Sequence, residues 1–453
     1  MKIGIDGFNL GLRQGTGIAT YAKELSKLLS TKGHEVSTLY GIRRVPHWDS
    51  ELAWPVFIQQ LATAGEPSRR QFLTWGPQTV TYGVQHLLGI PLRARELKRR
   101  PHIVSSSVDD KLSSSRNFLN IPSLFRASQA ISRVSSRPLG VSLPTSVKLD
   151  LFHFTCPLPI KIAGMPNVVT AHDIIPLMLP HSTEVDLRHY KRLTEISLKS
   201  ADLIVAVSEH SRRDILSSFN ISEQKIVTVH QAVDIPKEFC DLNSAEVSHF
   251  LNRNYGLQSG RYLLFYGALE PKKNLTRILD AIAAARSNVS LVVVGKKGWL
   301  NEEVTRQLDQ IKAIQKLRSL SDATQGGTVY HFDYVPFRNL MYLLKGARAL
   351  IFPSLYEGFG LPVLEAMVMG CPVITSNVSS LPEVGGDAVL YVDPLNAGDF
   401  AAAIDKIATD DELHGSLKAL GLKQAEKFSP AVHFSKLEQA YATVLKRRGR
   451  NLG

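Results

Sequence analysis

The residues best suited to binding or catalysis lie in the run 354–365, SLYEGFGLPVLE. Gly358 and Gly360 allow the backbone to approach a ligand closely, and the proline that follows suits the first turn of a helix. The free amides at such a helix start form an anion site suited to a diphosphate. Glu357 precedes the glycines and Glu365 lies about one turn into the helix, so we expect their carboxylates at different depths of one cleft. Taken by itself, the pattern fits a solvent-facing Glu357 and a locally bonded Glu365 equally well.

A pair of adjacent cations marks a second segment, YGALEPKKNL, at 266–275. Lys272 and Lys273 lie between a predicted strand and a predicted helix, and Asn274 is placed to cap that helix. Two lysines beside the positive end of a helix repel one another unless an anion joins them. The pair therefore indicates an anion site, with two solvated lysines as the alternative.

Polar or glycine residues also follow two strands in the first half of the sequence. His172 and Asp173 end the predicted strand of the segment VVTAHDIIPLMLP at 168–180, and open α/β sheets bind ligands at the carboxyl ends of their strands. A structural histidine with satisfied hydrogen bonds is the alternative. Gly15 and Gly17 form a glycine-containing turn after the first strand, a pattern that is weak evidence by itself.

Most of the chain alternates strands with helices, which predicts an α/β fold with parallel sheets covered on both faces. In the first half, strands are predicted at 2–6, 35–40, 151–154, 167–171, 202–207 and 225–229, and helices near 18–29, 184–199 and after Ser208. In the second half, strands are predicted at 261–266, 291–295, 328–332, 349–353 and 372–376, and a last helix at 430–446. We therefore predict an N-terminal domain at 1–250, a C-terminal domain at 251–430, and a helix and tail at 431–453 that would pack back toward the first domain.

Residues 41–150 interrupt this alternation, and we interpret them as a basic insertion in the N-terminal domain. Within them, residues 93–150 hold 11 Lys or Arg against 4 Asp or Glu, in a chain of formal net charge +12. A localised basic surface indicates an anionic partner, such as phospholipid head groups, a phosphorylated acceptor or nucleic acid. A solvated loop with surplus positive charge is the alternative.

The remaining composition argues against several classes of protein. The three cysteines, Cys156, Cys240 and Cys371, are widely spaced and fit neither a disulfide framework nor a zinc site, which favours the cytoplasm. No Asp-x-Asp motif is present, so we expect no bound metal. The N-terminus lacks the apolar core of a signal peptide, and no segment has the composition of a membrane span.

Around these residues the sequence resembles glycosyltransferase family 4, whose retaining enzymes have two Rossmann-like domains facing each other across a cleft, the GT-B fold. Glu357 and Glu365 match that family's two glutamates separated by seven residues, and the surrounding run 352–394 is similar to its donor-binding segment. The other three segments are similar to its basic pair, its histidine at a strand end and its first glycine-rich turn. Among family members, HDIIPL is especially similar to mannosyltransferases. The resemblance covers about 1–40 and 150–445.

The resemblance implies a role for each matching residue. The catalytic residues would be His172, Lys273 and Glu357. The donor-binding residues would be Gly15, Gly17, Lys272, Gly358, Phe359, Gly360, Leu361 and Glu365. Glu357 would contact hydroxyls of the donor sugar, Glu365 those of the ribose, and Lys273 the leaving diphosphate. Many members have Arg at the position of Lys272, and lysine cannot make the planar two-pronged contact of arginine.

The function that the resemblance implies is transfer of a hexose from a nucleotide sugar to a growing polysaccharide or lipid-linked glycan, as in lipopolysaccharide biosynthesis. Mannose from GDP-mannose is the first choice and UDP-glucose or UDP-galactose the alternative, with retention of configuration and no metal or other cofactor. A sugar-nucleotide epimerase, a glycan phosphorylase and a non-catalytic membrane- or nucleic-acid-binding protein are the competing classes. For the transferase we expect a nucleotide-sugar donor, a glycan acceptor, and peripheral contact with an anionic membrane from the cytoplasm, without nucleic acid.

Overall fold

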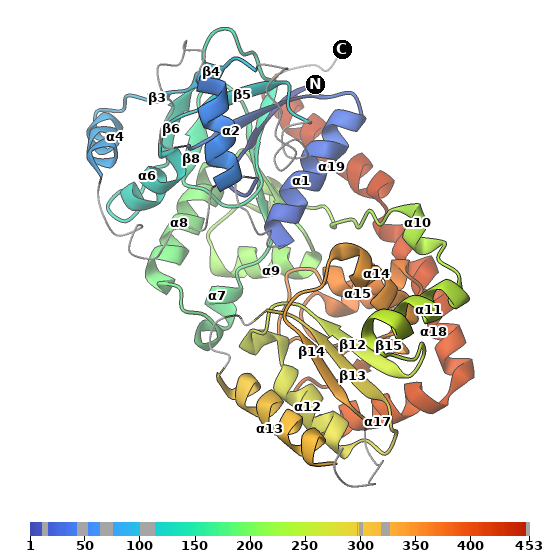
Figure 1. Ribbon diagram of the computed structural model, residues 1–453. Helices are drawn as coiled ribbons and strands as arrows, with labels where there is room; N and C mark the ends of the chain where they lie inside the picture. The colour runs from blue at the N-terminus through green and yellow to red at the C-terminus, as the bar shows by residue number, and fades with distance from the viewer. Residues whose placement is uncertain are drawn as a thin grey trace.

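The computed structural model describes residues 1–10, 17–42, 53–63, 76–99, 114–296, 298, 302–318 and 327–449. They form two α/β domains, each built on a largely parallel sheet that helices cover (Figure 1). The first domain is drawn in blue to green and the second in yellow to red, and the two face each other. This arrangement confirms the predicted fold class.

The N-terminal domain is built on an eight-stranded sheet in the order β11-β10-β9-β7-β1-β2-β5-β4. Its neighbouring strands are parallel except for the edge pair β4 and β5. Its strands are β1 (Lys2–Asp6), β2 (Glu35–Tyr40), β4 (Arg95–Leu97), β5 (Asn117–Asn120), β7 (Leu151–Phe154), β9 (Asn167–Ala171), β10 (Leu203–Ala206) and β11 (Ile226–Thr228). Inner strands such as β10 are apolar and buried throughout, because both faces of the sheet are covered.

Helices and a second, small sheet complete this domain. The helices are α1 (Gly17–Thr31), α2 (Ala53–Thr63), α4 (Pro77–Leu87), α6 (Leu124–Ile131), α7 (Ile175–Met178), α8 (Leu187–Ser200) and α9 (Glu209–Ser218). The small sheet holds β3 (Leu92–Arg93), β6 (Leu139–Ser142) and β8 (Ile160–Ile162). Helix α9 begins after Ser208 as predicted, and the Ser208 hydroxyl caps it by accepting a hydrogen bond of 2.9 Å from the amide of Ser211.

The C-terminal domain has a six-stranded parallel sheet in the order β14-β13-β12-β15-β16-β17. Its strands are β12 (Tyr262–Tyr266), β13 (Ser290–Val294), β14 (Val329–Phe332), β15 (Ala349–Phe352), β16 (Val373–Ser376) and β17 (Leu390–Val392). Its helices are α10 (Lys237–Cys240), α11 (Ser244–Tyr255), α12 (Leu275–Ala284), α13 (Glu302–Arg318), α14 (Phe337–Gly346), α15 (Leu361–Val368), α16 (Leu381–Gly385), α17 (Ala397–Thr409) and α18 (Asp411–Ala425).

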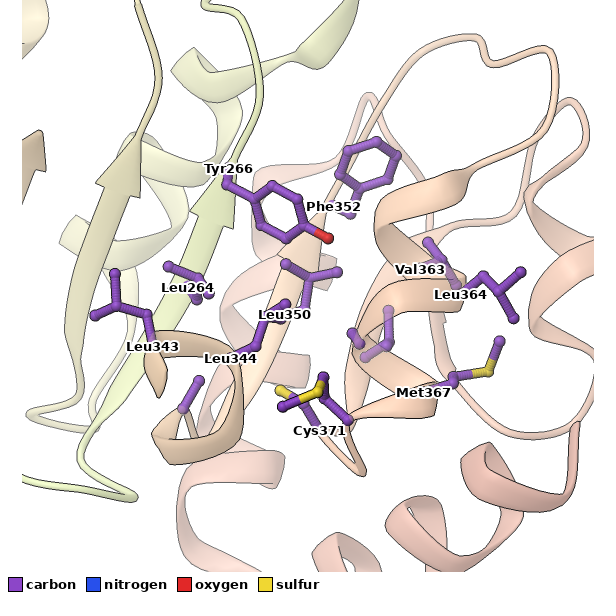
Figure 2. Packing of buried hydrophobic residues seen from close by; sticks show 14 of the residues in the cluster. Leu264, Tyr266, Leu343, Leu344, Leu350, Phe352, Val363, Leu364, Met367 and Cys371 are labelled. Carbon is purple, nitrogen blue, oxygen red and sulfur yellow. The ribbon is translucent and has the colours of Figure 1, made fainter. Parts of the chain in front are cut away.

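The core of this domain fixes the helix that carries much of the candidate site. Leu264 and Leu350 on adjacent strands face Val363 and Met367 on α15, and all four are buried (Figure 2). Burying side chains of this size contributes about 1.5–3 kcal/mol each. Helix α15 is therefore anchored along its apolar side, and its first turn is held at the carboxyl ends of β12 and β15.

The last helix, α19 (Pro430–Arg447), crosses back and packs on the N-terminal domain (Figure 1). Its buried Leu437 and Tyr441 belong to the same core as residues of β1 and α1. The Tyr441 hydroxyl lies 2.6 Å from Nδ1 of His153 on β7, and Nε2 of that ring lies 2.7 Å from Oγ1 of Thr170. The helix thus links the two domains through both apolar packing and a buried polar chain.

Part of the expected insertion at 41–150 is regular structure. Residues 117–120 form β5, which pairs with β2 and extends the main sheet rather than leaving it. The sequence NFLN is only four residues long and shows no clear alternation, so the pattern does not predict this strand. Residues 43–52, 64–75 and 100–113 of this segment lie outside the described part of the chain.

Candidate active site

The two charged segments predicted from the sequence meet at one edge of the C-terminal sheet. Strand β12 pairs directly with β15, so the loops that follow them emerge side by side. The Lys273 ammonium donates a hydrogen bond of 2.6 Å to Oε1 of Glu357, and these side chains are only 13% and 11% exposed. The same Nζ lies 4.7 Å from the centre of the Phe352 ring. A largely buried ion pair therefore lies at the carboxyl ends of β12 and β15.

Further charges surround this pair and favour the ionised form of Glu357. Burial by itself would raise the pKa of Glu357, but the nearby Lys273 and Lys272 outweigh it and lower that pKa. Burial opposes the charge of Lys272, while Glu357, Asp173 and Glu270 outweigh it and raise its pKa. Burial also raises the pKa of Glu270. Two cations thus lie among several carboxylates, so an anion that binds Lys273 must compete with Glu357.

Two carbonyl groups of the loop before α15 are bonded to a serine of the same domain. The Ser380 hydroxyl lies 2.9 Å from the carbonyl oxygen of Glu357 and 2.8 Å from that of Phe359. Gly360 has φ of 112°, a left-handed conformation that side chains disfavour, and it precedes the first residue of α15. The amides of Phe359, Gly360 and Leu361 have no acceptor among the described residues. They are free to bind an anionic oxygen.

The same loop is pressed against the N-terminal domain. The carbonyl oxygen of Gly358 lies 2.7 Å from the hydroxyl of Ser208 and 3.0 Å from that of Ser211. A Cβ atom on Gly358 would lie 2.4 Å from the carbonyl oxygen of His172. Glycine is therefore required here by space, and the candidate site is shared between the domains.

His172 lies directly after β9 with both of its ring nitrogens engaged. Its Nε2 donates to the carbonyl oxygen of Thr155 at 3.0 Å, and the Gln231 amide donates to Nδ1 at 2.8 Å. The rings of Tyr21 and His172 are nearly perpendicular, with 4.8 Å between their centroids. Burial lowers the pKa of His172, so the ring is neutral. Asp173 bonds instead to the amide of Ile175, at 3.1 Å.

Glu365 lines a cavity between the domains, beside the ion pair of Lys273 and Glu357. This cavity of about 460 Å³ is also lined by Leu361, residues of α1 and the segment 231–236 that joins the domains. The Tyr266 hydroxyl donates a hydrogen bond to its Oε2. Burial raises the pKa of Glu365 to about 7, although the Tyr266 bond opposes that change. This carboxyl therefore titrates near neutral pH.

The structure brings most of the predicted site residues together. Lys272, Lys273, Glu357, Gly358 and His172 meet where the domains touch, and Leu361 and Glu365 line the adjoining cavity. Gly17 begins α1, one turn before Tyr21, and is exposed. The predicted Gly15 lies outside the described residues. Among the described residues, no cluster of His, Cys, Asp or Glu is arranged to hold a metal ion.

One predicted detail is wrong, and three features of the site are not predicted by the sequence. Asn274 precedes α12 but does not cap it: its side-chain amide donates to the carbonyl oxygens of Pro353 and Pro394 instead. The unpredicted features are Gln231, the hydroxyl contact of Ser208 with Gly358, and Glu383. Glu383 accepts a bond of 2.8 Å from the amide of Glu209 and one of 2.5 Å from His230. Gln231 lies in an irregular segment, while Ser208 and Glu383 make their contacts with the other domain, and spacing along the chain carries no information about such contacts.

Two family models match this chain. Glycosyltransferase Family 4 matches residues 93–237, and Glycosyl transferases group 1 matches residues 252–424. The first match begins at residue 93, so the expectation that residues 93–150 lie outside the family is wrong. The two matches fall on the N-terminal and C-terminal domains respectively.

Individual relatives are similar to part of the chain or share its fold. It is 37% identical over 267 residues to the O-antigen chain mannosyltransferase B of Escherichia coli, covering 58% of this chain and 66% of that protein. It is 27% identical over 283 residues to the serotype-specific mannosyltransferase WbdA of Escherichia coli, covering 61% of this chain and 33% of that protein. The chain thus spans less than two thirds of the length of either relative. Sucrose-phosphate synthase from Thermosynechococcus elongatus shares the fold, with a TM-score of 0.62 at 16% identity over 99% of this chain and 100% of that one.

Proposed function

Because the chain belongs to the family 4 and group 1 glycosyltransferases, we propose that it is a retaining hexosyltransferase that takes mannose from GDP-mannose. The observation that carries this proposal is the buried pair of Lys273 and Glu357 beside the free amides before α15. A diphosphate bound there would gain Lys273 and the amides as partners, and would release Glu357 to accept hydrogen bonds from sugar hydroxyls. The Lys273 ammonium then stabilises the negative charge that develops on the leaving diphosphate.

Mannose is proposed from the names of two relatives, both of which are mannosyltransferases. The acceptor proposed is a growing polysaccharide or a lipid-linked glycan, since one of those names specifies the O-antigen chain. A UDP-hexose is the competing donor, because a structure of the same fold, from Anabaena, was solved with UDP and glucose.

The donor is tested by thermal unfolding of the protein with GDP-mannose, UDP-glucose, UDP-galactose and ADP-glucose in turn. A ligand present at about 100 times its dissociation constant stabilises the folded protein by about 2.7 kcal/mol. We expect that stabilisation with GDP-mannose and a much smaller one with the others. A larger rise in Tm with a UDP-sugar would overturn the choice of donor, and no rise with any nucleotide sugar would count against the transferase.

Retention of configuration is proposed because the two candidates for a base among the described residues, His172 and Asp173, are already engaged. An inverting enzyme needs a base that deprotonates the acceptor hydroxyl as it attacks opposite the leaving group. His172 has both nitrogens engaged, and Asp173 bonds to a backbone amide rather than to the imidazole. The geometry suits attack from the same face as the departing diphosphate, whose oxygen takes the acceptor proton.

We therefore expect the transferred mannose to keep the α configuration that it has in GDP-mannose. The one-bond coupling between C1 and its hydrogen in the fresh product distinguishes α from β mannosides by NMR. A β-linked product would contradict both the mechanism and the roles proposed for His172 and Glu357.

The raised pKa of Glu365 predicts how donor binding depends on pH. Below about pH 7 the carboxyl holds a proton, and above it the carboxylate accepts hydrogen bonds from ribose hydroxyls more strongly. The donor KM is therefore expected to rise by up to about tenfold as the pH falls from 8 to 6. Glu365→Gln should have a raised KM that no longer changes over this range. An unchanged pH profile in that variant would assign the titration to another group.

A further inference from the structure

Helix α4 turns its apolar side toward solvent. Val80, Val84, Leu87 and Leu88 follow one another at helical spacing, and their exposed fractions are 52%, 52%, 74% and 68%. A helix that packs on a domain normally buries such a stripe. Here the stripe is exposed, and α4 itself lies on the outer left side of the N-terminal domain (Figure 1).

The opposite side of α4 is polar and is hydrogen-bonded to the domain. The buried His86 places Nε2 at 2.7 Å from the hydroxyl of Ser135, and the Tyr82 hydroxyl donates to the carbonyl oxygen of Pro122 at 3.0 Å. These bonds fix how the helix is rotated about its axis. The helix cannot roll its apolar stripe inward without breaking them, so the exposure of that stripe is built into the fold.

The apolar patch extends beyond the helix and is bordered by cations. Ile90, 49% exposed, and Val134, 71% exposed, lie in the segments after α4 and α6, which are neighbouring helices. In the described ranges 76–99 and 114–150, the chain has 9 Lys or Arg against 2 Asp or Glu. The exposed cations of this basic border are Arg93, Arg133 and Arg137. Arg93 is three residues after Ile90, Arg133 precedes Val134 and also bonds to Asp186, and the amide of Arg137 donates to the hydroxyl of Ser135, the partner of His86 on α4.

We propose that this face, defined by Val80, Val84, Leu87, Leu88, Ile90 and Val134, docks the enzyme on an anionic membrane. The apolar side chains would enter the boundary between head groups and acyl chains, and the basic border would meet the anionic head groups. The proposal adds a partner to the proposed function, because a lipid-linked acceptor would be presented at such a surface. A second copy of the chain is a poorer occupant, since a two-fold contact would bring the two basic borders together.

The experiment measures co-flotation of the full chain with vesicles of phosphatidylcholine and phosphatidylglycerol. The test variant is Val84→Gln/Leu87→Gln, and the matched control is Leu395→Gln, an apolar residue 70% exposed in the C-terminal domain. We expect the partition coefficient of the test variant to fall by at least about tenfold and that of the control to stay unchanged. Equal flotation of both variants, or no flotation of the unmodified chain at low salt, would overturn the proposal.

Salt and activity distinguish docking through this face from docking by charge alone and from dimer formation. At 0.5 M NaCl the unmodified chain should bind more weakly but still measurably, because salt screens the basic border and leaves the apolar contact. Complete loss at high salt would mean docking by charge alone and would overturn the role of α4. A dimer without vesicles that the double substitution dissociates would assign the face to a second copy instead. Hydrolysis of GDP-mannose should be equal in both variants, so a failure of the donor proposal would be seen separately.

Discussion

Replacing Lys273 by alanine is expected to lower kcat by about 10²-fold or more while changing the donor KM less. The ammonium lies where the diphosphate would depart, and its charge matters most when the bond to the sugar breaks. Glu365→Ala should behave differently, because ribose contacts exist before and during the reaction. In that variant KM should rise more than kcat falls. Steady-state kinetics of nucleotide diphosphate release measure both.

Unfolding of Lys273→Ala would also lower its activity, and a second variant separates the two effects. Removing one partner of a buried ion pair leaves Glu357 uncompensated, and such losses cost about 3–5 kcal/mol. The double variant Lys273→Met/Glu357→Gln removes both charges and should recover most of the lost stability, as denaturant unfolding would show. Its kcat should stay low. If activity returned together with stability, the lysine would have a structural role only.

The fold was predictable because its strands are buried on both faces. Runs such as 203–206 and 349–352 are apolar at every position, and such runs are typical of parallel sheets covered by helices. The prediction failed for two strands that are not continuous apolar runs. Strand β5 is four residues long and holds two asparagines, and β4, paired with it at the edge of the sheet, is three residues long with polar residues at its first two positions.

The site residues were predictable singly, but their contacts were not. Lys273 and Glu357 are 84 residues apart, and they pair because β12 and β15 are neighbours in the sheet. The order of strands in a sheet depends on the path of the helices that connect them, and the local sequence pattern does not specify that path. Gln231 lies in the joining segment, where no periodic pattern marks it. The stripe of α4 has the same spacing as a core stripe, so only the folded structure reveals that it faces outward.

Gly358→Ala is expected to lower kcat/KM by about 10²-fold although it adds a single methyl group. The added Cβ would lie 2.4 Å from the carbonyl oxygen of His172 and 2.9 Å from Cβ of Asp173. The nearer of these is backbone at the end of a buried strand, so the loop before α15 or the whole domain contact must yield. Either movement displaces Glu357, the preceding residue, from Lys273, and displacements of about 1 Å at a reacting centre cost this much.

The matched control is Gly415→Ala, in α18. A Cβ there meets no atom within 4 Å, so alanine should raise the free energy of unfolding by about 0.4–1 kcal/mol and leave kcat/KM unchanged. Small-angle scattering of Gly358→Ala should show a larger radius of gyration if the domains separate, and an unchanged one if only the loop moves. Both results agree with a steric cause. A Gly358→Ala enzyme with normal kcat/KM would instead mean that catalysis uses a domain arrangement in which Gly358 and His172 are apart.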